Sequence, residues 1–522
     1  MTRRTLASAL ALLAVIPSAR AQTPAAAELA AAIDQRLEAA WKAAGVRAAP
    51  EVDDAEFLRR VTLDLTGTIP EEEAARGFLR QKEKDRRSRW VRGLLYGQGY
   101  AQSMAVRWSN LLLGRQRVLE SGGETSPLVL WLAQQLAANS PWDDVVRRLI
   151  AAEGSLEENG AVAWLMAYEN RPEEATGNAL RVFCGLEVQC AQCHDHPFDP
   201  SIKQTDFWSL AAFFARAGVE RDMDKAVLRE RPGGEVRIPR AGGAQGPVAN
   251  PRFLGGPELP REKGTHRRRE LARLLTAPEQ VAFAHTTIDR LWGFLFGRPL
   301  VEATGGGPPA LVELREHLAG ELRRSGFDLR RLTEALVLTR AYQRAAAGEP
   351  AKAAGQKGGK PDAQAALFAR ARLRPLPPEH LWASLERATG LEDLGAAGGG
   401  TPEERAERRR AWRAQFFATF AGDEQSGEGE QATVPQALAL INGPLTNALL
   451  RAGPESPLLK RVIALPADQR LESLYLRVLS RPPSPAERKA LSEGVRSSED
   501  ELVRYQDVLW ALLNSSEFLY NH

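Results

Sequence analysis

Glu56-Phe57-Leu58-Arg59-Arg60-Val61-Thr62-Leu63-Asp64-Leu65 carries apolar side chains at the spacing of an α-helix. Phe57, Leu58, Val61 and Leu65 lie three or four residues apart and therefore share one helix face. Gly67 follows the run and is typical of a helix end, while Pro70 and the three glutamates after it are typical of a new helix start. This part of the chain therefore predicts two consecutive amphipathic helices.

The same periodicity recurs through most of the 522 residues, so we expect a mainly α fold. Residues 228–264 break the pattern, because glycine and proline punctuate them around one strand-like run, Glu235 to Pro239. We expect a helical domain over residues 22–227 and a second one over residues 265–522. The Gly/Pro-rich connection between them is expected to hold a possible hairpin and the only β structure.

Several further stretches of the chain show helical spacing. Residues 346–364 and 395–401 interrupt the second domain and are rich in Gly and Ala, which is typical of flexible insertions. The predicted helical stretches are Trp90 to Leu95, Met104 to Leu113, Leu128 to Leu136, Trp142 to Ile150, Asn178 to Phe183, Phe207 to Phe214, Arg267 to about Ala345, and Leu471 to Tyr520.

Residues 1–21 have the pattern of a secretory signal peptide. Arg3 and Arg4 precede an apolar run from Leu6 to Ile16, and Ala19-Arg20-Ala21 forms a cleavage site before Gln22. The paired arginines leave general secretory and twin-arginine export both open. We therefore expect an exported protein, periplasmic, cell-surface or extracellular, with no transmembrane anchor after cleavage.

Removal of this signal would neutralise the net charge. The segment contains three arginines and no acidic residue, so Lys+Arg falls from 69 to 66 and equals the 66 Asp+Glu. A mature chain with no net charge has no overall positive electrostatic field that would attract a polyanion. We therefore expect no nucleic-acid partner, and the cluster Arg267-Arg268-Arg269 is interpreted as the polar start of a helix.

Cys190-Ala191-Gln192-Cys193-His194 carries the strongest chemical signal in the chain. C-x-x-C-H is the attachment pattern of c-type haem, in which two thiols bind the porphyrin and the adjacent imidazole ligates the iron. The predicted cofactor-binding residues are thus Cys190, Cys193 and His194, with His194 as the ligand of the haem iron. An exported chain reaches the compartment in which bacteria attach this haem.

Two other interpretations of the same block stay open. Some of Cys184, Cys190, Cys193, His194 and His196 could together make a plausible four-ligand set for zinc or another metal. Alternatively no metal binds, and a Cys190–Cys193 or Cys184–Cys193 disulfide stabilises a turn. A distal haem ligand is not apparent, since Met104, Met166 and Met223 are more typical of core packing.

The remaining chemical signals favour structural roles. Asp53, Asp54 and Asp64 with Arg59 and Arg60 are interpreted as a solvated or ion-paired helix face. No nucleophile elbow, zinc-protease helix or P-loop is present. The histidines interpreted as packed or surface residues are His285, His317 and His380, and the tryptophans assigned to the core are Trp108, Trp131, Trp142, Trp292 and Trp382.

With these residues in view, the chain resembles a family of exported bacterial proteins best known from planctomycetes. Its members carry two paired domains of unknown function, numbers fifteen-forty-nine and fifteen-fifty-three, often beside a planctomycete cytochrome c domain. The resemblance rests on Asp54 to Pro70, Cys190 to Asp199, Arg290 to Arg298, Gly326 to Leu332, Val434 to Leu438 with Asn442, and Trp510 to Leu519. It implies a fold and a context, and no defined activity.

Two classes of function follow as expectations. The first is a c-type haem protein for electron transfer or redox chemistry that acts with a redox or surface partner protein. The second is a non-redox binding or assembly module, whose Cys/His block is a disulfide- or metal-stabilised turn. A glycan hydrolase would need a carboxylate pair, and the sequence singles none out. Whether the chain is an enzyme is left open.

Overall fold

A computed structural model describes residues 25–222, 225–240, 245–260, 266–302, 306–346, 362–390, 401–420, 434–443, 457–495 and 501–522. The expected signal peptide lies outside these residues, as do most of the two expected insertions. The described chain is mainly α-helical with small sheets, which confirms the predicted fold class. None of the described helices combines the length and apolarity needed to cross a membrane.

Helix α2 (Asp54–Thr66) is the amphipathic helix that the sequence predicts. Its N-cap Asp53 accepts hydrogen bonds from the backbone N–H groups of Ala55 and Glu56 at 3.0 and 2.9 Å. Gly67 ends the helix in the left-handed conformation (φ 73°), which costs least for glycine. Local chemistry thus sets both ends of the helix.

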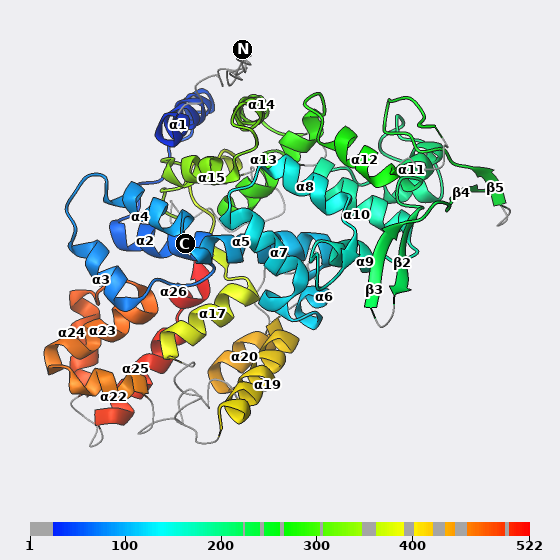
Figure 1. Cartoon of the computed structure of the whole chain (residues 1–522). Helices are drawn as coiled ribbons and strands as arrows, with labels where there is room; N and C mark the ends of the chain where they lie inside the picture. The colour runs from blue at the N-terminus through cyan, green and yellow to red at the C-terminus, as the bar shows by residue number, and fades with distance from the viewer. Residues whose placement is uncertain are drawn as a thin grey trace, which may run out of the picture.

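The first half of the chain is a succession of short helices (Figure 1). Short helices with buried apolar faces are stabilised mainly by packing on one another, not by intrinsic propensity. They are α1 (Ala26–Ala43), α2, α3 (Glu72–Arg80), α4 (Arg86–Leu95), α5 (Gln98–Leu113), α6 (Arg115–Glu120), the 3-10 helix η1 (Gly123–Thr125), α7 (Pro127–Ala137), α8 (Trp142–Ile150), α9 (Val162–Met166), α10 (Pro172–Cys184), the 3-10 helix η2 (Gln189–Gln192) and α11 (Gln204–Ala211).

The second half is built in the same way. Its helices begin at Arg267, where the sequence predicts that helical structure resumes. They are α12 (Arg267–Leu275), α13 (Val281–Phe296), α14 (Pro309–Arg324), α15 (Leu329–Leu338), α16 (Ala363–Ala366), α17 (Pro378–Thr389), α19 (Pro402–Phe420), α20 (Val434–Asn442), α22 (Pro457–Ala464), α23 (Ala467–Leu479), α24 (Pro485–Val495), α25 (Glu501–Leu513) and α26 (Ser516–Leu519).

The β structure is more extensive than expected. The predicted strand appears as β4 (Arg237–Pro239), which pairs antiparallel with β5 (Gln245–Val248). A second sheet has the order β1 (Gly154–Ser155), β3 (Lys225–Glu230), β2 (Ala217–Asp222), and Val219 lies opposite Leu228. The expectation that residues 228–264 hold all the β structure is therefore wrong, because this hairpin starts at Ala217 and β6 (Arg374–Pro375) pairs with β7 (Tyr520–Asn521).

The hydrophobic core does not divide at the Gly/Pro-rich connection. One cluster joins α1–α11 to α12–α15, so that Leu37 and Trp108 belong to the same core as Trp292 and Leu336. A second cluster holds α17–α26 and includes Leu63 of α2. Figure 1 shows α1 beside α14 and α15, and α17, α19 and α20 on the opposite side of the molecule.

The tryptophans take the places that the sequence predicts, with one difference. Trp108, Trp142, Trp292 and Trp382 are buried, which confirms their assignment to the core. Trp131 is only partly buried and packs against the edge of the same cluster.

The two halves of the chain also meet at buried charges on α2. The Arg59 guanidinium donates to the carbonyls of Val478 and Phe518 at 2.9 and 3.0 Å. Arg60 donates to the carbonyls of Arg344 and His522 at 2.8 and 2.6 Å. These side chains are buried and bind the end of the chain, and Arg60 also pairs with Glu56 at 2.8 Å. This face of α2 is therefore internal, and of the solvated and ion-paired interpretations it is the ion-paired one that agrees with the structure.

Candidate functional site

The Cys/His block lies on a surface turn between α10 and α11. Helix α10 ends at Gly185 in the left-handed conformation (φ 66°), as the sequence predicts, and η2 then carries Cys190. Val188 and Ala191 are buried and hold the turn on the core, while Cys190, Cys193 and His194 are exposed. The three predicted cofactor-binding residues are therefore presented together on one short exposed segment.

One ring nitrogen of His194 forms a hydrogen bond. Its Nδ1 lies 2.8 Å from the carbonyl oxygen of Asp195. A carbonyl only accepts, so Nδ1 carries the proton and Nε2 keeps a free lone pair. No described residue forms a hydrogen bond with that Nε2. This is the arrangement of a metal-binding histidine, which donates its other N–H to a neighbouring acceptor.

His196 differs from His194, because both of its ring nitrogens form hydrogen bonds. Its Nε2 donates to the carbonyl of Glu187 at 2.9 Å. Its Nδ1 accepts from the backbone N–H groups of Phe198 and Asp199 at 3.3 and 2.9 Å. A neutral imidazole satisfies all three bonds at once. His196 thus closes the loop and has no lone pair left for a metal in this conformation.

Helix α11 fixes the backbone of the block. Gln204 donates to the carbonyls of Gln192 and Cys193 at 3.2 and 3.0 Å, and Trp208 Nε1 donates to the carbonyl of Gln192 at 3.1 Å. The Asp195 carboxylate accepts from the Gln204 backbone N–H at 3.0 Å at the start of α11. That backbone bond, and then the Lys203 side chain, lower the pKa of Asp195.

Cys184 is separated from the other two cysteines by its environment. It is the last residue of α10 and is buried in the main core. Burial raises the pKa of its thiol to about 12, and metals bind the thiolate form. All three cysteines are free thiols in this structure. Across the described ranges, no three His, Cys, Asp or Glu side chains gather as a metal-binding group would.

The block can therefore offer two exposed thiols and one imidazole nitrogen to a ligand. Sequence reasoning identified these three groups and missed those that hold them, namely Asp195, Gln204 and Trp208. No local sequence signal marks these contacts, because they join residues between nine and sixteen positions apart. Of the methionines considered as distal ligands, Met104 is buried in the core, Met166 is partly buried, and Met223 lies outside the described residues.

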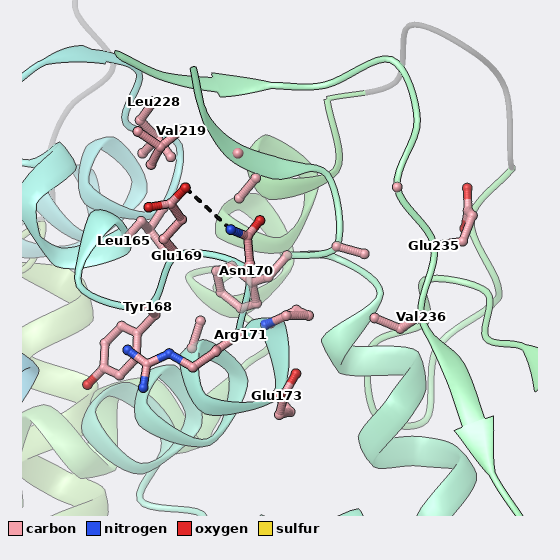
Figure 2. Close-up of a pocket in the computed structure, with 17 residues that line it drawn as sticks. Leu165, Tyr168, Glu169, Asn170, Arg171, Glu173, Val219, Leu228, Glu235 and Val236 are labelled. Carbon is pink, nitrogen blue, oxygen red and sulfur yellow. Dashed lines mark hydrogen bonds between the residues drawn. The ribbon is translucent and has the colours of Figure 1, made fainter. Parts of the chain in front are cut away.

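A cavity of about 340 Å³ lies at the other end of α10. Figure 2 shows Leu165, Val219 and Leu228 along one side and Glu235 with Val236 on another. Glu169, which accepts from Asn170 Nδ2 at 3.3 Å, and Glu173 are the other carboxylates of its wall. The residues that line it include no Ser, Thr, Cys, His or Lys, so the reactive groups of this wall are the glutamate carboxylates and the Tyr168 hydroxyl.

The other isolated histidines occupy the structural places that the sequence suggests. His285 Nε2 lies 2.9 Å from a carboxylate oxygen of Glu316, and His317 Nδ1 lies 3.3 Å from the Arg36 guanidinium. His380 is buried beside Arg107, with 3.5 Å between His380 Nε2 and the guanidinium nitrogen.

Comparison with known proteins gives two family matches. Residues 32–218 match the family described as Protein of unknown function (DUF1549), and residues 267–495 match the one described as Protein of unknown function (DUF1553). Together these matches cover most of the chain and place the Cys/His block inside the first domain. No curated protein and no solved structure matches the chain.

Proposed function

We propose that this protein, which belongs to the family that pairs the DUF1549 and DUF1553 domains, is an exported c-type haem protein. Cys190 and Cys193 would hold the haem through their sulfurs, and His194 Nε2 would ligate its iron. When bound, the haem supplies a redox couple for electron transfer or redox chemistry. The free Nε2 of His194, on the same exposed segment as the two exposed thiols, is the observation that carries this proposal.

The surrounding residues suit this role. The Asp195 carbonyl orients the His194 ring, and such second partners fix the ring and raise the basicity of the ligating nitrogen. Gln204 and Trp208 fix the backbone on which Cys193 stands, so the thiols and the imidazole keep their spacing. Because the turn is exposed, a partner redox or surface protein can approach it directly.

A non-redox binding or assembly module is the second candidate. It is favoured by the complete hydrogen bonding of the His196 loop, which is closed without any cofactor. In that case the Cys/His block is a structural turn, and a Cys190–Cys193 disulfide or a bound zinc ion would stabilise it further. In the haem protein, the two exposed thiols form thioether bonds to the porphyrin. In the structural module, they do not.

Expression of the full chain in a host that matures c-type cytochromes distinguishes them. We expect a purified protein whose Soret absorption survives acid–acetone extraction. The double variant Cys190→Ala/Cys193→Ala should lose this band. The matched control is Cys184→Ala, which removes the buried cysteine and should keep the band. His194→Ala should retain covalent haem but change the spin state of the iron, because only the axial nitrogen is lost.

Other results would overturn the haem proposal. A colourless protein that contains stoichiometric zinc or a Cys190–Cys193 disulfide supports the structural module. Equal colour in the wild type and in the double cysteine variant would show that the haem binds elsewhere.

A further inference from the structure

Phe198 is the most exposed large apolar side chain among the described residues, with 89% of its surface open to solvent. The next is Tyr96 at 72%, whose ring contacts the Arg330 guanidinium 4.6 Å from the ring centre. Single exposed apolar residues are common on protein surfaces. Phe198 differs from these because it follows His194 by four residues and because its backbone is fixed.

The loop that carries this ring, residues 196–202, is held by hydrogen bonds within itself. His196 Nδ1 accepts from the Phe198 N–H at 3.3 Å, and the His196 N–H donates to the Ile202 carbonyl at 3.0 Å. The Ile202 N–H donates to the Asp199 carbonyl at 3.1 Å, and the Ile202 side chain is buried. The loop thus presents an apolar ring to water at a defined position, and the hydrophobic effect favours any apolar group that covers it.

His196 also holds this loop against the turn that carries the cysteines. Its Nε2 donates to the carbonyl of Glu187, three residues before Cys190, at 2.9 Å. Its ring and the Phe198 ring meet edge to face with 6.2 Å between their centres. One imidazole ring thus separates Phe198 from the backbone that leads into Cys190.

Two prolines add to this apolar surface. Pro197 precedes Phe198 and Pro200 follows Asp199, and both prolines are exposed. Proline has a fixed φ and no backbone N–H, so it stiffens the loop and offers water no donor. Phe198 and its flanking prolines therefore form a small apolar surface beside the Cys/His block.

A haem attached to this block would need such a surface. The porphyrin is a large, mostly apolar plane, and its burial is one of the means by which a protein sets the redox potential of the iron. The apolar shell around a metal controls solvent access in the same way. A porphyrin held by Cys190 and Cys193 is therefore a group that could cover the Phe198 ring.

We infer that the Phe198 ring packs against the porphyrin attached at Cys190 and Cys193 and excludes water from part of it. This inference rests on the proposed haem attachment, and it adds a residue that packs on the cofactor without bonding to the iron. Ferric haem carries one more positive charge than ferrous haem, so water around it favours the ferric state. The packed ring should therefore raise the midpoint potential above that of an open haem.

The full chain and its variants, expressed in a host that matures c-type cytochromes, test this inference. Phe198→Ala should keep the Soret band that survives acid–acetone extraction, because the thioether bonds are unaffected, but its midpoint potential should be lower than that of the wild type. Phe198→Leu keeps an apolar side chain and should fall between the two. The matched control is Tyr96→Ala, which removes another exposed aromatic ring and should have the potential of the wild type. Tyr96 follows α4, which Figure 1 shows on the opposite side of the molecule from α11.

Fluorine NMR reports the contact directly. In protein labelled with para-fluorophenylalanine, the Phe198 resonance is the one that is missing from Phe198→Leu. The iron should shift and broaden this resonance in the ferric protein. In the haem-free variant Cys190→Ala/Cys193→Ala, the same resonance should be sharp and close to that of the free amino acid. Circular dichroism shows that each variant is folded.

Two results would overturn the inference, and they are distinguishable. Equal midpoint potentials in the haem-loaded wild type and Phe198→Ala, or a Phe198 resonance that the iron leaves unaffected, would leave the haem proposal intact and assign Phe198 to the docking of a partner protein. A colourless wild type would remove the haem proposal and this inference with it.

Discussion

The Asp64 carboxylate accepts hydrogen bonds from the Arg374 guanidinium at 3.0 Å to each of its two oxygens, across 310 residues of sequence. Asn521 and Tyr342 also donate to this carboxylate, at 2.9 and 2.7 Å. Asp64 is buried, so it is the negative centre through which α2, β6 and the chain end are joined.

We expect Asp64→Asn to destabilise the protein by roughly 3–5 kcal/mol, because it leaves the Arg374 charge without its partner in the interior. The matched control is Asp54→Asn on the same helix. Asp54 is partly exposed and pairs with Arg86 and Arg87, so its loss should cost about 1 kcal/mol or less. Urea unfolding followed by circular dichroism measures both. Similar losses for the two variants would contradict the junction role of Asp64.

The contrast between these two aspartates shows how far sequence reasoning reaches. The ends of α8, Trp142 and Ile150, follow from local apolar spacing and were predicted at both residues. The end of α10 follows from Gly185, whose left-handed conformation is also a local property. The sequence places Asp54 and Asp64 in one charged group on α2, and only tertiary packing buries Asp64 beside Arg374.

The candidate haem site shows the same division. Cys190, Cys193 and His194 were found because their chemistry depends on sequence spacing. The spacing assigns His194 to the haem iron, but it does not show that His196 closes the following loop. Their roles depend on the carbonyls of Asp195 and Glu187, which the turn geometry alone brings into place.

Thiol labelling of the haem-free, reduced protein is expected to reach two of the three cysteines. Cys190 and Cys193 are exposed, whereas Cys184 is buried with its pKa raised to about 12. The thiolate is the nucleophile, so iodoacetamide at pH 8 should add two carbamidomethyl groups to the folded protein and a third after denaturation. Mass spectrometry of intact and digested protein measures this. Modification of Cys184 in the folded state would contradict its placement in the core.

His196→Ala is expected to loosen the loop that follows the Cys/His block. The variant loses the bond to the Glu187 carbonyl and the acceptor of the Asp199 N–H. Amide exchange at Phe198 and Asp199 should therefore accelerate, while exchange in α10 stays unchanged. The matched control is His194→Ala, which removes a ring that holds no backbone N–H of this loop. Equal acceleration in both variants would show that His196 does not close the loop.

The last prediction concerns pH and His380. Burial, followed by the charges of Arg107, Arg374 and Arg115, lowers the pKa of His380 well below its ordinary value. Its folded-state pKa is then below its unfolded-state pKa, so the unfolded chain binds a proton first as the pH falls. The free energy of unfolding should therefore be fully retained above about pH 6.5 and fall by up to ~1.4 kcal/mol per pH unit below it, until the folded-state pKa is reached. His266, His317 and His522, whose pKa values burial also lowers, add to the loss in the same direction.

His380→Gln keeps an acceptor for Arg107 but cannot titrate, so its urea midpoint should vary less between pH 7.5 and 5 than that of the wild type. A profile as steep as that of the wild type would assign the pH dependence to the other three histidines.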